Sequence, residues 1–127
     1  MITLKPRTHD PHELHFSILS DSVYAGALTV YLLTPTTFSY GIYIKREMRT
    51  NGYAEETIRL LFDIMRQKGY VLAIARVAAN NAASIALHQS LGFTLDHEEE
   101  GILCFSLSLD LPADNVPGVG EETAVQN

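Results

Sequence analysis

The stretch RTNGYAEETIRLL, residues 49–61, decides the fold, because a strand pattern ends there and a helix pattern begins. The residues before it, FSYGIYI (38–44), are rich in aromatic and β-branched side chains, as strands are. After Gly52, apolar side chains repeat at helical spacing at Ala54, Ile58, Leu61 and Met65. A glycine between a strand and a helix is needed only where φ is positive or where another group approaches the backbone closely. The stretch therefore raises the question of what approaches Gly52.

The elements around this stretch follow from the same two periodicities. Short alternating runs predict strands before it, at 2–6, 14–19 and 23–33, with a bulge at Gly26. After it, we expect the first helix to end before Gly69, and then a nearly all-apolar strand covered on both faces (70–77), a second helix (82–91) and a hairpin (93–96 with 101–110). The helices fall only in the second half of the order β-β-β-β-α-β-α-β-β. This order predicts an α+β fold, a mixed α/β sandwich.

Length and composition limit the class of protein. A chain of 127 residues predicts one domain, which we place at residues 1–110. Residues 111–127 lack apolar periodicity and carry only acidic charge, which predicts a disordered tail. The net charge of −6 argues against a nucleic-acid partner. No apolar run is long enough for a bilayer and no signal-peptide pattern is present, so we expect a cytoplasmic protein with no membrane partner. The single cysteine, Cys104, excludes an internal disulfide and fits a reducing compartment.

The start of the first helix has the features of an anion site. A helix N-terminus leaves backbone N–H groups unpaired and carries a partial positive charge. Here Lys45, Arg46 and Arg49 precede it, opposed only by Glu47. Two interpretations remain open from the residues alone, a tight turn with solvated charges or a phosphate or pyrophosphate site. The residues match neither the P-loop nor the dinucleotide-binding pattern.

Two motifs in order carry a resemblance to a known family. RTNGYA fits R-x-x-G-x-A, and NNAASIALHQSLGF (80–93) is similar to N-x-A-S-I-x-L-x-x-x-L-G-F. Together they resemble the GNAT superfamily of acetyl-CoA-dependent N-acetyltransferases over roughly residues 14–109. The resemblance implies a central mixed, mostly antiparallel sheet of about six to seven strands with two main helices. It also implies acetyl-CoA as cosubstrate and a primary amine, on a small molecule or on a peptide or protein, as acceptor.

The resemblance also assigns cofactor-binding residues. It implies that the pyrophosphate is held by backbone N–H groups of the loop residues Arg49, Thr50, Asn51, Gly52, Tyr53 and Ala54. It implies that the pantetheine arm bonds to the backbone of Tyr43 and Ile44 like an added strand. Asn81, Ser84 and His88 share one helix face by spacing. Asn81 is explained equally well as an N-cap, while the matching asparagine of the family lies near the cofactor arm.

His88 is the candidate catalytic residue. Many family members have a tyrosine at this position, and it acts as general acid to the leaving thiolate. An imidazole with a pKa near 6.5 can donate that proton to a thiolate with a pKa near 8.5, provided that it is charged and within reach. The alternative is a surface histidine on an amphipathic helix. The sequence does not choose a base among Glu47, Tyr40, Tyr43, Glu13 and a water chain, and positioning alone is a further possibility.

The sequence also predicts that a metal site and two of the family's helices are absent. His9, His12 and His15 would not converge in an extended segment, so we predict no metal site. The two helices that family members commonly carry between their first two strands are missing here. An open acceptor pocket, a pocket completed by a second subunit in a homodimer, and lost acceptor binding are then the alternatives. The last of these corresponds to a non-catalytic CoA-binding sensor or interaction domain on the same fold.

Overall fold

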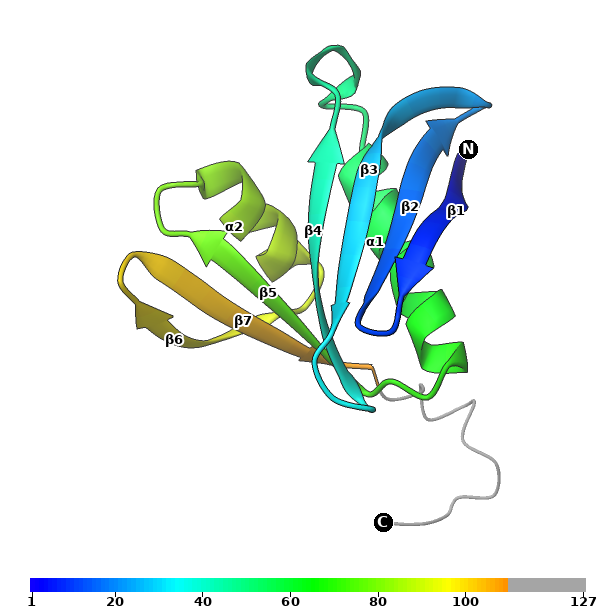
Figure 1. The fold of residues 1–127 in the computed structure, drawn as a ribbon. Helices are drawn as coiled ribbons and strands as arrows, with labels where there is room; N and C mark the ends of the chain where they lie inside the picture. The colour runs from blue at the N-terminus through cyan, green and yellow to red at the C-terminus, as the bar shows by residue number, and fades with distance from the viewer. Residues whose placement is uncertain (110–127) are drawn as a thin grey trace, which may run out of the picture.

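The computed structural model describes residues 1–109, apart from the side chains of Thr8 and His9. These residues form one seven-stranded mixed sheet and two α-helices (Figure 1). The α+β class and the strand number predicted from the sequence are confirmed. The acidic tail predicted for 111–127 lies outside the described residues.

The observed elements follow the predicted order. The strands that precede the first helix are β1 (Ile2–Asp10), β2 (Glu13–Ser20), β3 (Val23–Leu32) and β4 (Thr37–Ile44). A 3₁₀ turn, η1 (Arg46–Met48), leads into α1 (Tyr53–Gln67). The second half consists of β5 (Leu72–Ala78), α2 (Ala82–Ser90), β6 (Thr94–Glu99) and β7 (Ile102–Ser108). The spatial order is β1-β2-β3-β4-β5-β7-β6, and β4–β5 is the single parallel pair among these strands.

The first strand is longer than the predicted 2–6. β1 pairs with β2 as far as Asp10, across a bulge between Pro6 and His9. Pro6 is tolerated because β1 is an edge strand. Its outer side has no neighbouring strand to which a backbone N–H would have to donate. Only Pro11 and His12 separate β1 from β2, so no helix stands between these strands.

Both helices cover the same face of the sheet. α1 buries Ile58, Leu61 and Met65 against it, and the ring of Phe62 lies 5.9 Å from that of Phe93, just after α2. Because side chains alternate along a strand, the residues between the buried ones point to the other face. There Tyr31 and Tyr43 are 41% and 52% exposed. We call this second surface the helix-free face, and its residues on β3 to β5 include Thr29, Tyr31, Ser39, Gly41, Tyr43, Ile74 and Arg76.

The helix-free face explains one wrong expectation. Residues 70–77 were expected to be covered on both faces of the sheet. Ala73, Ala75 and Val77 are buried, but Ile74 is half-exposed and Arg76 is exposed. The second face stays open because no helix of the described residues packs on it.

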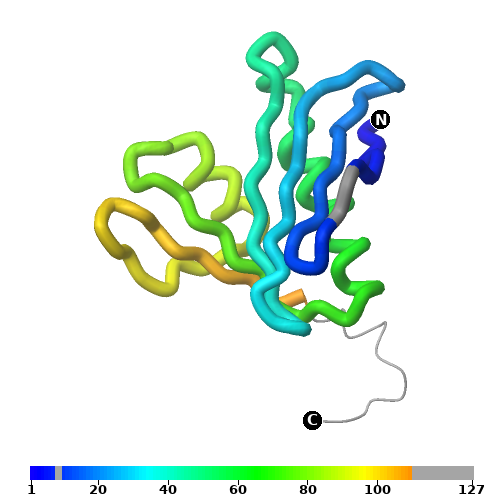
Figure 2. Tube along the Cα trace, in the orientation of Figure 1, coloured from blue at the N-terminus to red at the C-terminus, as the bar shows by residue number. Residues whose placement is uncertain are grey.

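Strands β4 and β5 separate soon after they meet. They pair only over Thr37–Ser39 and Leu72–Ile74. Beyond these residues they diverge into a V that opens toward the loop before α1, as Figures 1 and 2 show. We call the space along β4 from Tyr40 to Ile44 the β4–β5 gap. The backbone of β4 that faces this gap has no neighbouring strand.

Gly26 sets which backbone groups face the gap. A Cβ atom on Gly26 would lie 1.9 Å from the Tyr43 carbonyl oxygen, so β3 and β4 can approach this closely only with glycine. The predicted bulge is present beside Gly26, where β2 pairs with Gly26 and then with Tyr24. The Tyr43 carbonyl therefore faces β3. Since backbone groups alternate along a strand, those of Ile42 and Ile44 face the gap.

Candidate functional site

The loop before α1 presents an open helix N-terminus. Gly52 is the N-cap residue, with φ of +77°, in the left-handed region that favours glycine. A Cβ atom on Gly52 would meet nothing within 4 Å, so the glycine borders open space. Within the described residues, no side chain caps the start of α1. Backbone N–H groups of the first turn are thus available to an anion.

A cavity of about 180 Å³ lies at this helix start. Six predicted cofactor residues line it: Ile44, Arg49, Thr50, Gly52, Tyr53 and Ala54. Three lining residues were not predicted: Met48, Glu55 and Leu87. Leu87 belongs to the second of the two motifs that resemble the family, so its place in that motif could have marked it as a site residue. It comes from α2, which shows that the cavity lies on the helix-covered side of the sheet.

Hydrogen bonds of loop side chains hold the loop against β4 and against itself. Arg49 Nε donates to the Ile44 carbonyl oxygen at 2.8 Å, and its Cζ lies 5.9 Å from the centre of the Tyr43 ring. Asn51 Nδ2 donates to the Met48 carbonyl oxygen at 3.1 Å, and Asn51 does not line the cavity. Tyr43 also stays outside it, with its carbonyl turned to β3. A ligand strand along β4 would therefore meet the backbone of Ile42 and Ile44, not that of Tyr43.

Tyr40 and His88 form a hydrogen-bonded pair where the gap begins. Tyr40 is the first residue of β4 beyond the last pair with β5. Its hydroxyl oxygen lies 2.9 Å from His88 Nε2 of α2, and the two rings stack. His88 is only 4% exposed, so the alternative of a surface histidine is wrong.

The hydrogen bonds of His88 show that its Nδ1 carries a proton. Nδ1 lies 2.8 Å from the Ser84 carbonyl oxygen, which can only accept, so Nδ1 carries the proton. Burial lowers the pKa of His88, although the bond to Ser84 acts in the opposite direction. The lowered pKa favours the neutral imidazole, whose Nε2 is the acceptor for the Tyr40 hydroxyl. Burial raises the pKa of the Tyr40 phenol, which keeps that donor protonated.

Asn81 and Ser84 have structural contacts that hold His88. Asn81 Oδ1 accepts from the Ser84 backbone N–H at 3.1 Å, so Asn81 is the N-cap of α2. The Ser84 carbonyl then accepts from His88 one turn later. Neither side chain lines the cavity at the loop. Their sequence-predicted contact with a cofactor arm stays a prediction.

The other candidate bases lie away from the gap or are already paired. Glu47 accepts from Lys45 at 3.3 Å, and its pKa is lowered by its own backbone hydrogen bond and by Lys45. Glu13 pairs with His15 at 3.1 Å on β2, two strands from the gap. The ligand atoms of Asp10, Glu13 and His15 lie within 4.8 Å of one another. Asp10 is exposed and already accepts from the His12 backbone N–H, and Glu13 already pairs with His15, so we propose no metal site here.

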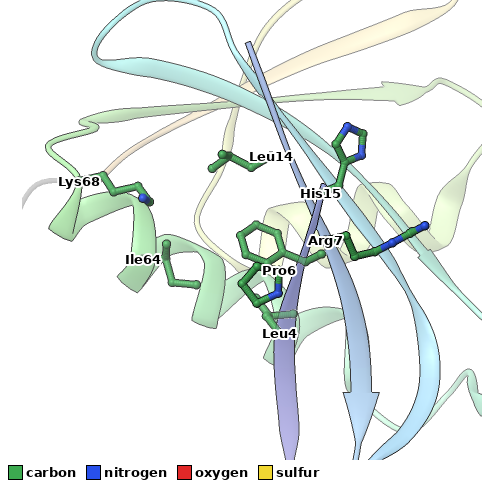
Figure 3. A pocket seen from close by; sticks show the side chains of 8 residues that line it. Leu4, Pro6, Arg7, Leu14, His15, Ile64 and Lys68 are labelled. Carbon is green, nitrogen blue, oxygen red and sulfur yellow. The ribbon is translucent and has the colours of Figure 1, made fainter. Parts of the chain in front are cut away.

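A larger cavity of about 440 Å³ lies at the opposite end of α1 (Figure 3). Ile64 of α1 and Lys68, which follows the helix, lie on one side of β1, and Arg7 and His15 project on the other. The lining is completed by Leu4, Pro6, Leu14 and Phe16. It shares no residue with the cavity at the loop, and α1 spans about 22 Å between them. Size alone therefore does not identify the functional site of this fold.

Comparisons with known proteins agree with this arrangement. The model of the acetyltransferase (GNAT) family matches residues 1–93. An L-methionine sulfoximine/L-methionine sulfone acetyltransferase from Pseudomonas aeruginosa is 30% identical over 59 residues, which cover 46% of this chain and 34% of that protein. The enzyme of the same description from Salmonella typhimurium is 34% identical over 59 residues, with the same shares. The match thus spans about a third of the length of these curated relatives.

Solved structures show the same fold at low identity. A GNAT family acetyltransferase from Elizabethkingia anophelis with acetyl-CoA bound superposes with a TM-score of 0.74 at 12% identity, covering 84% of this chain and 97% of that one. The PaiA N-acetyltransferase from Thermoplasma acidophilum in complex with coenzyme A gives 0.71 at 15% identity, covering 76% and 61%. Neither helix of the described residues is long and apolar enough to cross a membrane. With its fold, its loop and the family match in agreement, the chain belongs to the acetyltransferase (GNAT) family.

Proposed function

We propose that this protein is an N-acetyltransferase that moves an acetyl group from acetyl-CoA to a primary amine. The observation that carries the proposal is the uncapped start of α1, which opens into a cavity reaching Ile44 at the end of the β4–β5 gap. This joins an anion site to a free strand edge. A pyrophosphate binds at an anion site, and the amide groups of the pantetheine arm bond to a free strand edge.

The backbone of the chain supplies most of this binding. The N–H groups around Gly52 bind the pyrophosphate, and Arg49 holds the loop against β4. Ile42 and Ile44 bond to the arm along the gap. From Ile44 to Tyr40 is four residues of strand, about 13 Å. An arm that spans this length of the edge would end beside Tyr40.

The Tyr40–His88 pair can move the proton that acetyl transfer releases. Acetyl-CoA supplies an activated thioester, and the amine attacks its carbonyl carbon while the carbon–sulfur bond breaks. The Tyr40 oxygen accepts the proton of the amine as the Tyr40 proton passes to His88 Nε2. His88, now charged and disfavoured by burial, returns a proton through Tyr40 to the departing sulfur. His88 thus retains the acid role predicted from sequence but begins neutral, and Tyr40 touches the reactants.

Three finer points belong to the same proposal. The acceptor is an amine, and the similarity to L-methionine sulfoximine/L-methionine sulfone acetyltransferases favours a small amino-acid type compound. The single cysteine supports a cytoplasmic location. A homodimer would cover part of the helix-free face and complete the acceptor pocket, which sedimentation measurements on the purified chain will test.

The test of the proposal combines binding with turnover. Calorimetry should show acetyl-CoA binding to the full chain, and acceptors drawn from amino acids, polyamines and peptides should be screened for thiol release and for acetylated product. Binding without product from any acceptor would favour the second candidate, a non-catalytic CoA-binding domain. That candidate is supported by the lack of helices between β1 and β2. No binding of acetyl-CoA would end both.

A further inference from the structure

The two faces of the β4–β5 gap are chemically different. The cavity at the loop includes Leu87 of α2, so acetyl-CoA, if bound as proposed above, lies on the helix-covered side. The acceptor then has to reach the thioester from the helix-free face. The side chains that border the gap on that face therefore determine which acceptors fit.

On the helix-free face, the gap is bordered by a glycine of β4 and an arginine of β5. Pairing of β4 with β5 ends at Ser39 and Ile74. The next residues that point to the same face are Gly41 on β4 and Arg76 on β5. A Cβ atom on Gly41 would meet nothing within 4 Å, so β4 places no side chain across the entrance. Arg76 supplies the only formal charge among these four residues.

Arg76 is available to bind a ligand. It is exposed, and its partner across β7 is the uncharged Cys104. Among residues 1–109, no hydrogen bond or ion pair of its side chain is found, whereas Arg59 and Arg66 pair with Glu55 and Asp63 on α1. The nearest neighbours on its own strand and face are Ile74 and Ala78, which bring no carboxylate.

We propose that Arg76 binds the carboxylate of the acceptor, so that the substrate class is amino acids with a free carboxylate beside the reacting amine. A guanidinium binds a carboxylate through two parallel N–H···O bonds, which orients as well as holds it. Polyamines, and peptide N-termini whose carboxylate is an amide, are disfavoured. This proposal rests on the proposed function.

The test follows the effect of one substitution on an acceptor that has the carboxylate and on its amide, so that each compound serves as its own reference. L-phenylalanine and L-phenylalaninamide are assayed for acetylated product with the full chain and with Arg76→Gln. Loss of a charge-assisted pair of this kind typically costs 10- to 100-fold. We expect kcat/KM for the amino acid to fall at least tenfold in Arg76→Gln, while kcat/KM for the amide and the Kd of acetyl-CoA stay within twofold. Lys5→Gln is the matched control, because Lys5 is another exposed cation, on the strand at the far edge of the sheet.

The outcomes separate this proposal from the function on which it rests. Equal losses for acid and amide, or no loss for the acid, would overturn the role of Arg76 while leaving acetyl transfer intact. If the wild-type chain acetylates neither compound, binding of L-phenylalanine to the CoA-saturated protein is measured by calorimetry. Arg76→Gln should then weaken that binding, and a wild-type chain that binds none of it also overturns the proposal. Failure to bind acetyl-CoA would instead count against the proposed function itself.

Discussion

Replacing Gly52 by valine tests whether the loop before α1 is the pyrophosphate site. Gly52 has φ of +77° and borders open space, so the new side chain would project into the cavity without striking protein atoms. Any ligand phosphate that approaches the backbone there would meet two methyl groups. We predict at least a tenfold rise in the Kd of acetyl-CoA, about 1.4 kcal/mol.

The substitution also has a cost for folding that must be separated from binding. A residue with a Cβ atom in the left-handed region costs about 1–2 kcal/mol. A typical domain has about 5–15 kcal/mol of stability, so the variant should remain folded with a lowered melting temperature. Gly69→Val is the matched control, because Gly69 has φ of +93°, also borders open space and lies just beyond the other end of α1.

The measurement is calorimetric titration with acetyl-CoA of the wild type and both variants, with melting curves taken on the same samples. Both valine variants should lose similar stability, and only Gly52→Val should lose affinity. A folded Gly52→Val protein that binds acetyl-CoA as tightly as the wild type would remove this loop as the site. Equal weakening in both variants would show that the effect comes from α1 as a whole.

Three further predictions follow from the same geometry. Tyr40→Phe and His88→Ala should each lower kcat about 100-fold or more with little change in acetyl-CoA affinity. The double variant should lose no more than the worse single variant, because the two residues act as a unit. If the two losses multiply in the double variant, the residues act independently and the relay is contradicted. The relay needs His88 to begin neutral, and burial lowers the pKa of His88 below 6.5. With saturating acceptor, kcat should therefore be level above about pH 6.5 and should fall in more acidic solution. A kcat that falls as the pH rises through the His88 pKa would instead support the mechanism in which His88 acts only as an acid. Gly26→Ala should destabilise by about 2–3 kcal/mol in denaturant unfolding, because the new Cβ meets the Tyr43 carbonyl, whereas Gly41→Ala on the neighbouring strand should change stability by less than about 0.5 kcal/mol.

Features set by neighbouring residues in the chain were predictable. The change of period at Gly52 located the first helix, and the structure begins it at Tyr53. An N-cap was one of the two alternatives for Asn81 because of its place before the second helix, and its side chain accepts from Ser84 N–H. Gly52 and Gly69 were expected at turns and both have positive φ. Each of these depends on contacts within about four residues, which the sequence lists in order.

Features set by how separate elements pack were not predictable. In the second helix the polar face that carries Ser84 and His88 turns inward, so the usual rule that polar residues face solvent would place His88 on the surface. The depth of His88 depends on the register of β4, which brings Tyr40 to it from 48 residues away. In the mechanism proposed above, that contact decides the first step, because it presents His88 Nε2 to the Tyr40 hydroxyl as a proton acceptor. The same residue at the same motif position therefore has a different first step than its sequence suggests, and the packing of α2 on β4 is the physical reason.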